Sequence, residues 1–587
     1  MKRINFILDK CMAIAVLLLA MVLYGCESNF LDTVPSNGVS SQTIWTTSNL
    51  AQKAVTGVYA ELLDPYRDQP FWDVHTVILD YDRNWLGDVP DLTGTAVPSS
   101  GLFSKWWARC YESIHRANDV IANISKVPDM SDADKARFIA EMKFLRAYHY
   151  MELNILYKGV PVYLEPVEPS QATNGRESES AVWDIIVKDL TDCINEPNLP
   201  NKYDSGNSNY GHITKGAAYA LRGKVYLWLK EWGKAEQDFK TVGTLGYSLF
   251  SDYKALFKEA NERCDEMIFT VQCFNEAGLG NIKNWRFGTR VTYLSLWNNY
   301  LVNPKFVDSY ECSDGKKFDW EDFIPGYTSM GTSARAVFFL RDGITESERS
   351  VMTEYGADMS KYLPDGNEAR IKKAYSDRDP RMDMTVIVPY STYFGGITGQ
   401  GLDYTLRWPW RSQNTPYFDL TTDTNAKYYY LMRKFVGEGT EINLWNNSPI
   451  DMPVIRYGDV LLCLAEALNE QGKVDEAVAE INKVRARAGA ILLNTNEHTT
   501  VTGQENLRQR IRNERYWELA GEDVVFFDEL RWGTWKDTKF YPDNGLMEIW
   551  GTQTYKWMWP GEKMWKWPIP QAEMEKNQNL TQNEGWY

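Results

Sequence analysis

Several tryptophans in this sequence stand beside planar polar side chains, in segments that lack helical periodicity. Trp85 follows Asp82, Arg83 and Asn84, and Trp297 precedes two asparagines. An indole face can stack on the C–H face of a sugar ring, while amides, carboxylates and guanidinium groups can hydrogen-bond its hydroxyls. This pattern predicts carbohydrate binding without catalysis, and the candidate residues are Trp72, Asp82, Asn84, Trp85, Trp285, Arg286, Trp297, Trp320, Trp408 and Trp410. For each tryptophan the alternative is a place in a local core, because Trp is highly buried on average.

Motifs for catalysis are missing from the sequence. It contains no His-Glu-x-x-His, no Gly-x-Ser-x-Gly and no phosphate-binding loop. A glycosidase needs two carboxylates at a set separation, and the 79 acidic residues offer no basis for choosing a pair. We therefore expect no enzyme activity and no cofactor, whereas the sequence decides neither the identity of the sugar nor the presence of a metal ion.

The composition limits the kinds of partner. The chain has 587 residues and a formal net charge of −16, which argues against nucleic acid and anionic membrane surfaces as partners. It contains 23 Trp, as many as Phe, although Trp is usually the scarcest aromatic residue. Either the cores are rich in tryptophan, or part of the indole surface serves a ligand.

The N-terminus predicts export. Lys2 and Arg3 precede an apolar run over residues 11–23, which is too short for a stable membrane span but suits a signal peptide. The run ends in Leu-Tyr-Gly-Cys26, which resembles a bacterial lipoprotein box. We expect a signal peptide over residues 1–25, a lipid anchor on Cys26 and a tether over 26–41; the alternative is a plain secretory signal with an incidental cysteine. Among the other cysteines, Cys264 and Cys273 could form a disulfide.

Two segments fit a tetratricopeptide-type repeat of two antiparallel helices. In residues 216–246, the small Gly223 and Ala235 allow two helices to approach closely, and Tyr226 and Phe239 fill the space beside them. A second copy spans residues 458–490. Because one hairpin cannot bury its own apolar face, further helical pairs must pack on these two. The sequence predicts a mainly α fold built on helical hairpins.

The hydrophobic period changes in the middle of the chain. Between residues 251 and 454, Gly, Pro, Asn and aromatic residues dominate, and short strands are predicted at 267–272 and 384–388. We expect a helical block over 42–250, a loop-rich insertion over 251–454 and a second helical part with a tail over 455–587. The tail from residue 557 is expected to lie across the surface.

A dispersed set of motifs resembles the SusD/RagB family of surface glycan-binding lipoproteins. The motifs are, in order, RANDVI at 116–121, EMKFLRAY at 141–148, DPR at 379–381, NKVRARAG at 482–489, WPIP at 567–570 and NLTQNEG at 579–585. The order covers nearly the whole mature chain. One departure is Gly-Glu-Asp at 521–523, before an aromatic-Asp pair that the family more often precedes with Arg.

The resemblance implies a location, a partner and a division of roles. It implies an outer-membrane lipoprotein that faces the exterior and passes oligosaccharide or polysaccharide to a TonB-dependent transporter. It favours Trp85 and Trp297 most among the binding residues. It also implies that some charged motif residues are scaffold paired between helices, namely Glu141, Arg146, Arg456, Glu466, Arg485 and Glu514. The alternatives are a protein-binding helical solenoid and a glycoside hydrolase.

Overall fold

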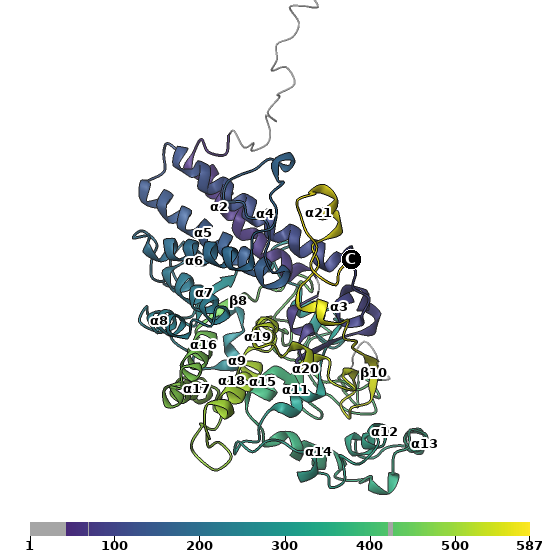
Figure 1. The fold of residues 1–587 in the computed structure, drawn as a ribbon. Coiled ribbons are helices and arrows are strands. Elements are labelled where there is room, and N and C mark those ends of the chain that lie inside the picture. The colour runs from purple at the N-terminus through teal and green to yellow at the C-terminus, as the bar shows by residue number, and fades with distance from the viewer. Residues whose placement is uncertain (1–42, 69, 421–426) are drawn as a thin grey trace, which may run out of the picture.

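The computed structural model describes residues 43–68, 70–420 and 427–587, and of residues 83–85 only the backbone. Helices dominate the fold and strands β1–β10 are two to five residues long, which confirms the predicted mainly α class. Helices α2, α4–α8 and α16–α18 run down one side of the molecule, and α12–α14 form a lobe at one end (Figure 1). The predicted signal peptide over 1–25, Cys26 and the tether over 26–41 lie outside the described residues.

The N-terminal helices begin where the sequence places capping residues. Helix α5 (Asp132–Tyr157) starts after Ser131, whose hydroxyl accepts a hydrogen bond from the amide of Asp134 at 3.1 Å. Helix α6 (Glu179–Asn195) starts in the same way after Ser178. Such caps satisfy an amide that the first helical turn leaves unpaired. The other long helices of this block are α2 (Ser48–Ala60) and α4 (Gly101–Asn123).

The two predicted repeats are helical hairpins that pack on each other. The first comprises α7 (Lys215–Trp228) and α8 (Trp232–Gly243), and the second α16 (Tyr457–Glu470) and α17 (Val474–Ala488). A Cβ atom on Gly223 would lie 2.5 Å from the ring of Phe239, so only glycine permits this approach of α7 and α8. Helix α16 packs against α8, although more than 200 residues separate them in the chain.

The chain segment between the two hairpins starts and ends at the same place on the helical scaffold. Strand β2 (Met267–Val271) pairs antiparallel with β8 (Met452–Arg456), directly before α16. The second predicted strand is shorter than expected, since β4 covers only Val386–Ile387. Short helices that the sequence did not indicate fill much of this segment: α10 (Lys283–Phe287), α11 (Pro304–Ser309), α12 (Thr332–Arg335), α13 (Glu346–Glu354), α14 (Asn367–Ser376) and α15 (Arg381–Thr385).

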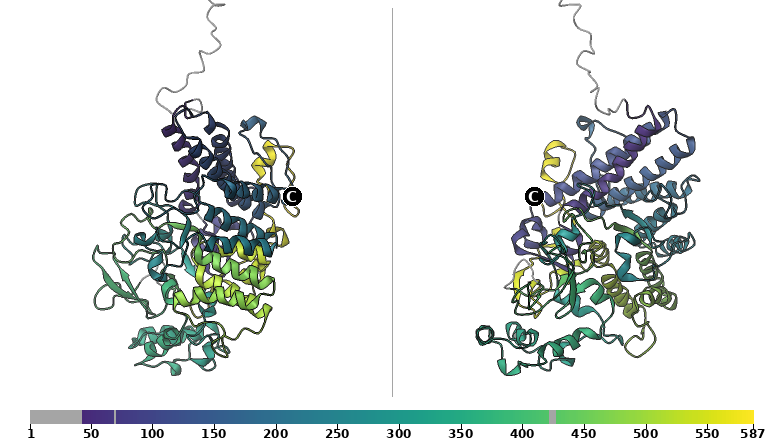
Figure 2. Two further views of the ribbon diagram at one scale, coloured as in Figure 1. Left: turned by 90° about the vertical axis from the view of Figure 1, so that its left-hand side faces the viewer. Right: turned by 180° about the vertical axis from the view of Figure 1, so that it is seen from behind.

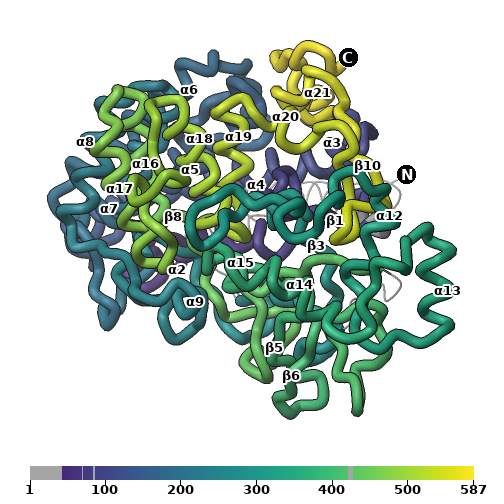
Figure 3. Tube along the Cα trace, turned by 90° about the horizontal axis from the view of Figure 1, so that it is seen from below, coloured from purple at the N-terminus to yellow at the C-terminus, as the bar shows by residue number. Residues whose placement is uncertain are grey.

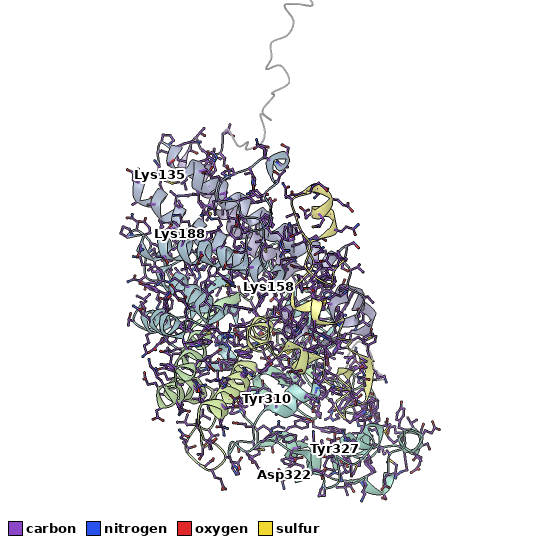
Figure 4. The ribbon with its side chains drawn as sticks, in the orientation of Figure 1. Lys135, Lys158, Lys188, Tyr310, Asp322 and Tyr327 are labelled. Carbon is purple, nitrogen blue, oxygen red and sulfur yellow. The ribbon has the colours of Figure 1, made fainter. Side chains whose placement is uncertain are left out.

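Seen from below, the scaffold helices and the short strands lie on different sides of the molecule. Helices α5–α8 and α16–α18 occupy one, and β1, β3, β5 (Thr392–Gly395), β6 (Leu402–Thr405) and β10 the other (Figure 3). Lys135 and Lys188 lie on the N-terminal helices, while Asp322 and Tyr327 lie at the opposite end of the molecule (Figure 4). None of the helices in the described part of the chain is both long and apolar enough to cross a bilayer.

The C-terminal segment returns to the N-terminal helices instead of lying on the surface. It contains α18 (Gln504–Leu519), α19 (Val525–Trp532), α20 (Trp535–Lys539), β9 (Gly545–Met547), β10 (Gln553–Lys556) and α21 (Gln571–Lys576). The amide of Trp567 donates to the carbonyl of Leu156 at 2.8 Å, and Asn583 Nδ2 donates to the carbonyl of Tyr157 at 2.9 Å. Trp567 and Trp586 are buried, which corrects the expectation of a surface tail. Figure 2 shows this segment beside the N-terminal helices.

The predicted scaffold charges are buried and paired. Arg456 contacts Glu266, Glu518 and Glu522 at 2.7 to 2.8 Å. The remaining pairs join Arg146 to Asp189, Glu141 to Arg137, Arg485 to Glu514 and Glu466 to Arg531. Glu522 belongs to the segment that departs from the family pattern, and its pairing with Arg456 shows that the departure leaves no charge unpaired there.

The cysteines of the described chain are free thiols. Cys264 and Cys273, the pair that could have formed a disulfide, are not bonded to each other. Cys110, Cys193 and Cys463 are buried in helices α4, α6 and α16.

Candidate functional site

Three half-buried tryptophans, Trp285, Trp297 and Trp445, meet at one place and are called here the indole cluster. The ring centroid of Trp285 lies 4.4 Å from that of Trp445 and 5.2 Å from that of Trp297, and the other two centroids are 6.3 Å apart. Their planes are inclined by 42 to 80°, so the rings do not close into a single stack. Leu294 and Leu444 precede Trp297 and Trp445 in the chain and are exposed, which extends the apolar surface.

A two-stranded sheet brings the first long loop to this cluster. Strand β1 (Leu79–Tyr81) pairs antiparallel with β3 (Tyr300–Val302), and Tyr81 is opposite Tyr300. The amide of Asp82 donates to the carbonyl of Asn299 at 2.9 Å. Because Asp82 follows β1 and Asn299 precedes β3, the backbone after β1 lies beside the segment that carries Trp297.

The strongest predicted residue of the first loop follows this contact directly. The 3₁₀ helix η3 (Arg83–Asp88) contains Asn84 and Trp85. The side chains of Asn84 and Trp85 lie outside the described residues, so their part in binding stays a prediction. The backbone nevertheless brings together two segments that are more than 200 residues apart in sequence.

The loop that carries Trp297 has an unusual backbone. Leu294, Ser295 and Asn298 have φ angles of 70, 59 and 40°, in the left-handed region that non-glycine residues seldom adopt. The loop is tied down by two hydrogen bonds, from the amide of Trp297 to the carbonyl of Trp285 at 3.3 Å and from the amide of Asn298 to the carbonyl of Gly288 at 2.8 Å. Strained conformations of this kind cluster at binding sites, where the surrounding structure holds them in place.

Trp445 is the member of the cluster that sequence reasoning missed. Its segment is fixed by Ser448, which forms an isolated β-bridge with Asn281. A Cβ atom on Gly280 would lie 2.4 Å from the backbone of Asn447, so glycine is needed for this approach. A signal was present, since Leu-Trp-Asn-Asn occurs twice, at 296–299 and at 444–447.

Arg286 packs against the cluster, and Asp82 lies beside it in the chain after β1. The Cζ atom of Arg286 lies 3.6 Å from the ring centroid of Trp285, and its Nη1 donates to Asn299 Oδ1 at 2.9 Å. Both Arg286 and Asp82 are buried. Burial lowers the pKa of Arg286, but an arginine remains charged in proteins. Their burial argues against the prediction that these two side chains face sugar hydroxyls. Arg286 contacts Trp285 instead, and the backbone of Asp82 fixes the loop.

Three of the predicted tryptophans are core residues. Trp72, Trp320 and Trp408 are 7, 8 and 6% exposed. Trp72 is stacked on Phe526 at a centroid distance of 5.2 Å, and Trp320 on Tyr327 at 5.0 Å. Their faces are occupied by other aromatic rings, so they offer no stacking surface to a sugar.

Trp410 is half-buried in a different neighbourhood. The next residue, Arg411, forms an ion pair with Glu348 at 2.7 Å, which fixes this segment to helix α13. None of the ring contacts in the described chain joins Trp410 to the indole cluster.

Family comparisons agree with this architecture. A family model described as "SusD family" matches residues 265–586, which is more than half of the chain. The protein belongs to the SusD family. A second model, described as "Starch-binding associating with outer membrane", matches residues 29–227.

Individual relatives cover almost the whole chain at low identity. "SusD-like protein P25" of Formosa agariphila is 22% identical over 584 residues, or 96% of each chain. "Starch-binding protein SusD" of Bacteroides thetaiotaomicron is 23% identical over 523 residues, which is 85% of this chain and 81% of the relative. The crystal structure of a SusD-like carbohydrate binding protein from Bacteroides fragilis superposes with a TM-score of 0.72 at 23% identity, covering 92% of this SusD-family chain and all of that one.

Proposed function

We propose that this SusD-family protein binds an oligosaccharide or polysaccharide through the indole cluster of Trp285, Trp297 and Trp445. The observation that carries the proposal is the meeting of three half-buried indoles at one place. Soluble proteins bury most of their Trp, and a group of partly accessible aromatic rings is a typical ligand surface. Trp85 in η3 is proposed as a fourth stacking residue.

The mechanism is capture and release. Rings that are inclined to each other can contact successive sugars of a curved chain, and stacking selects the apolar face that pyranoses share. The strained loop and the buried Arg286 hold the indoles in place before the ligand arrives, so little conformational entropy is lost on binding. No bond in the glycan is broken, and the glycan leaves unchanged.

Delivery and anchoring complete the proposal. Membership in the family and its description as outer-membrane associated support a place at the outer membrane. A lipid on Cys26 would hold the protein there, facing the exterior, and a TonB-dependent transporter would receive the glycan. Recovery of such a transporter with the protein after mild solubilisation of outer membranes supports this part of the proposal, and consistent absence of one contradicts it.

Affinity electrophoresis tests the binding function. The purified protein is run through native gels that each contain one polysaccharide from a chemically diverse panel. We expect at least one glycan to retard it, and chromatography of that glycan after incubation to find no shorter products. Retardation by none of a broad panel contradicts glycan binding, and shorter products contradict the non-catalytic part.

A further inference from the structure

Cys110, His149 and Glu152 form a buried cluster between two N-terminal helices, outside the indole cluster. Cys110 lies on α4, and His149 and Glu152 lie one turn apart on α5. Their exposed fractions are 1, 5 and 7%. One ligand atom from each of the three lies within 4.8 Å of the other two. A thiol, an imidazole and a carboxylate are the side chains that bind zinc in proteins.

The distances between these atoms fit one tetrahedral ion. Zinc bond lengths of about 2.3 Å to sulfur and about 2.0–2.2 Å to nitrogen and oxygen put tetrahedral ligands about 3.6 Å (S to O) and about 3.4 Å (N to O) apart. Cys110 Sγ lies 3.7 Å from Glu152 Oε2, and His149 Nδ1 lies 3.3 Å from the same oxygen. Two of the three separations therefore already match a tetrahedral ligand set, and the third lies within 4.8 Å.

The charges in the cluster are compatible with a divalent cation. The only cationic partner of Glu152 within the described chain is His149, which is charged only if protonated. The adjacent basic residue, Arg109, forms ion pairs with Asp64 and Asp68 at 2.5 and 2.8 Å. A thiolate and a carboxylate would together balance the two charges of one ion, which a buried site requires.

The cluster borders an internal space. His149 and Glu152 line a cavity of about 120 Å³, together with Leu62, Tyr66 and Trp106. The cavity gives a path to the cluster and space for a water molecule as a further ligand.

We propose that Cys110, His149 and Glu152 bind one Zn²⁺ ion, with a fourth coordination position that opens into the cavity. The mixed sulfur, nitrogen and oxygen donors favour zinc over calcium or magnesium, which prefer oxygen alone. On binding, the thiol proton passes to solvent and the sulfur–zinc bond replaces the S–H bond. The ion would then join α4 to α5.

Metal titration of the full chain tests the site. After removal of metal with a chelator, zinc is added in competition with a chromophoric chelator, and Co²⁺ is used in parallel as a spectroscopic probe. We expect one high-affinity zinc per chain and a thiolate-to-cobalt charge-transfer band. No zinc uptake near one equivalent, or cobalt binding without that band, overturns the proposal, and neither result depends on a variant.

Variants locate the ion. Cys110→Ser and His149→Gln are each expected to weaken zinc binding by about 100-fold or more, since even changes outside the ligand set cost about 10–100-fold. The matched controls are Cys193→Ser, at a buried cysteine of α6, and His115→Gln, at an exposed histidine of α4, and both should bind zinc like the unaltered protein. Wild-type affinity in folded Cys110→Ser and His149→Gln proteins, with folding checked by circular dichroism, contradicts the assignment.

Discussion

At the centre of the indole cluster, Trp285 contacts both other tryptophans, and Arg286 covers one of its faces. A ring with one face covered offers less stacking surface to a sugar and mainly supports the neighbouring rings. Trp297 and Trp445 therefore have the larger part in the proposed stacking, while the Trp285–Arg286 pair fixes their separation. A cation held flat against an indole contributes roughly 0.5–2 kcal/mol, depending on its desolvation.

The role of Arg286 is tested by Arg286→Lys. Lysine keeps the charge but cannot lie flat on Trp285 while also donating to Asn299, so the cluster should loosen. We expect the affinity for a retarding glycan to fall about threefold to tenfold, which corresponds to roughly 0.7–1.4 kcal/mol. Isothermal titration calorimetry gives the affinity. Arg407→Lys, at a half-buried arginine paired with Asp419, is the control and should bind normally; equal affinity in both variants contradicts the positioning role.

At the scale of the elements, the close approach of α7 and α8 depends on one glycine. Alanine normally stabilises a helix interior by about 1 kcal/mol relative to glycine. At position 223 the added methyl group would meet the ring of Phe239 at 2.5 Å, and overpacking of this kind costs about 1–3 kcal/mol. The contact with Phe239, and not the helix propensity of alanine, is expected to decide whether Gly223→Ala stabilises or destabilises the protein.

We therefore expect Gly223→Ala to destabilise the protein, by up to about 2 kcal/mol once the gain in propensity is subtracted. The penalty should disappear in a Phe239→Leu background, which a double-mutant cycle in urea measures. Gly233→Ala in the same hairpin is the control, because its nearest atom is a glutamine side-chain oxygen at 3.8 Å. Stabilisation by Gly223→Ala would show that the helices have room to separate.

The long helices could be predicted from sequence because their signals are local. Ser131 and Ser178 cap α5 and α6, and the spacing of Gly223, Ala235 and Phe239 indicates the hairpin. Strands β1 and β3 could not be predicted in this way. Each has only three residues, and the partner that stabilises each strand lies more than 200 residues away.

At the scale of the whole molecule, a buried charge network joins α18 to the rest of the fold. Glu518 on α18 contacts Arg381, Arg456 and Arg487. Burial opposes its ionisation, but Arg487, Arg456 and Arg381 outweigh this effect and lower the pKa of Glu518 to about 2. Because the pKa in the folded state lies below that of an unfolded chain, the stabilisation is present at neutral pH and is lost as the pH falls from about 4 to about 2.

Glu518→Gln should therefore cost about 3–5 kcal/mol of unfolding free energy at pH 7, because it leaves buried arginines without their partner. The difference from the unaltered protein should shrink toward pH 3, because the unfolded chain then binds a proton on Glu518 that the folded protein does not. Chemical denaturation at several pH values measures it. Glu573→Gln, in a surface pair with Lys576, is the control and should change stability by less than about 1 kcal/mol. A difference that does not change with pH contradicts the assignment.

Part of the site was predictable, because stretches such as Trp297-Asn298-Asn299 combine an indole with amides in a non-helical segment. Trp285 and Trp297, both predicted as binding residues, lie in the cluster, and the part of these two and of Trp85 in binding stays a prediction. The sequence could not separate them from Trp72, Trp320 and Trp408, because burial depends on distant aromatic partners such as Phe526 and Tyr327. Trp445 was missed for a similar reason, since only the folded chain brings it beside Trp285.

The central claim, that the indole cluster binds glycan, is tested most directly by affinity electrophoresis of three single variants. In a gel that contains a glycan able to retard the unaltered protein, Trp297→Ala and Trp445→Ala should each weaken binding by about tenfold or more, as for an interface residue worth roughly 1.4 kcal/mol. Trp410→Ala, at a half-buried tryptophan outside the cluster, should be retarded normally. Unchanged retardation of the Trp297 and Trp445 variants, or an equal loss in all three, contradicts the claim.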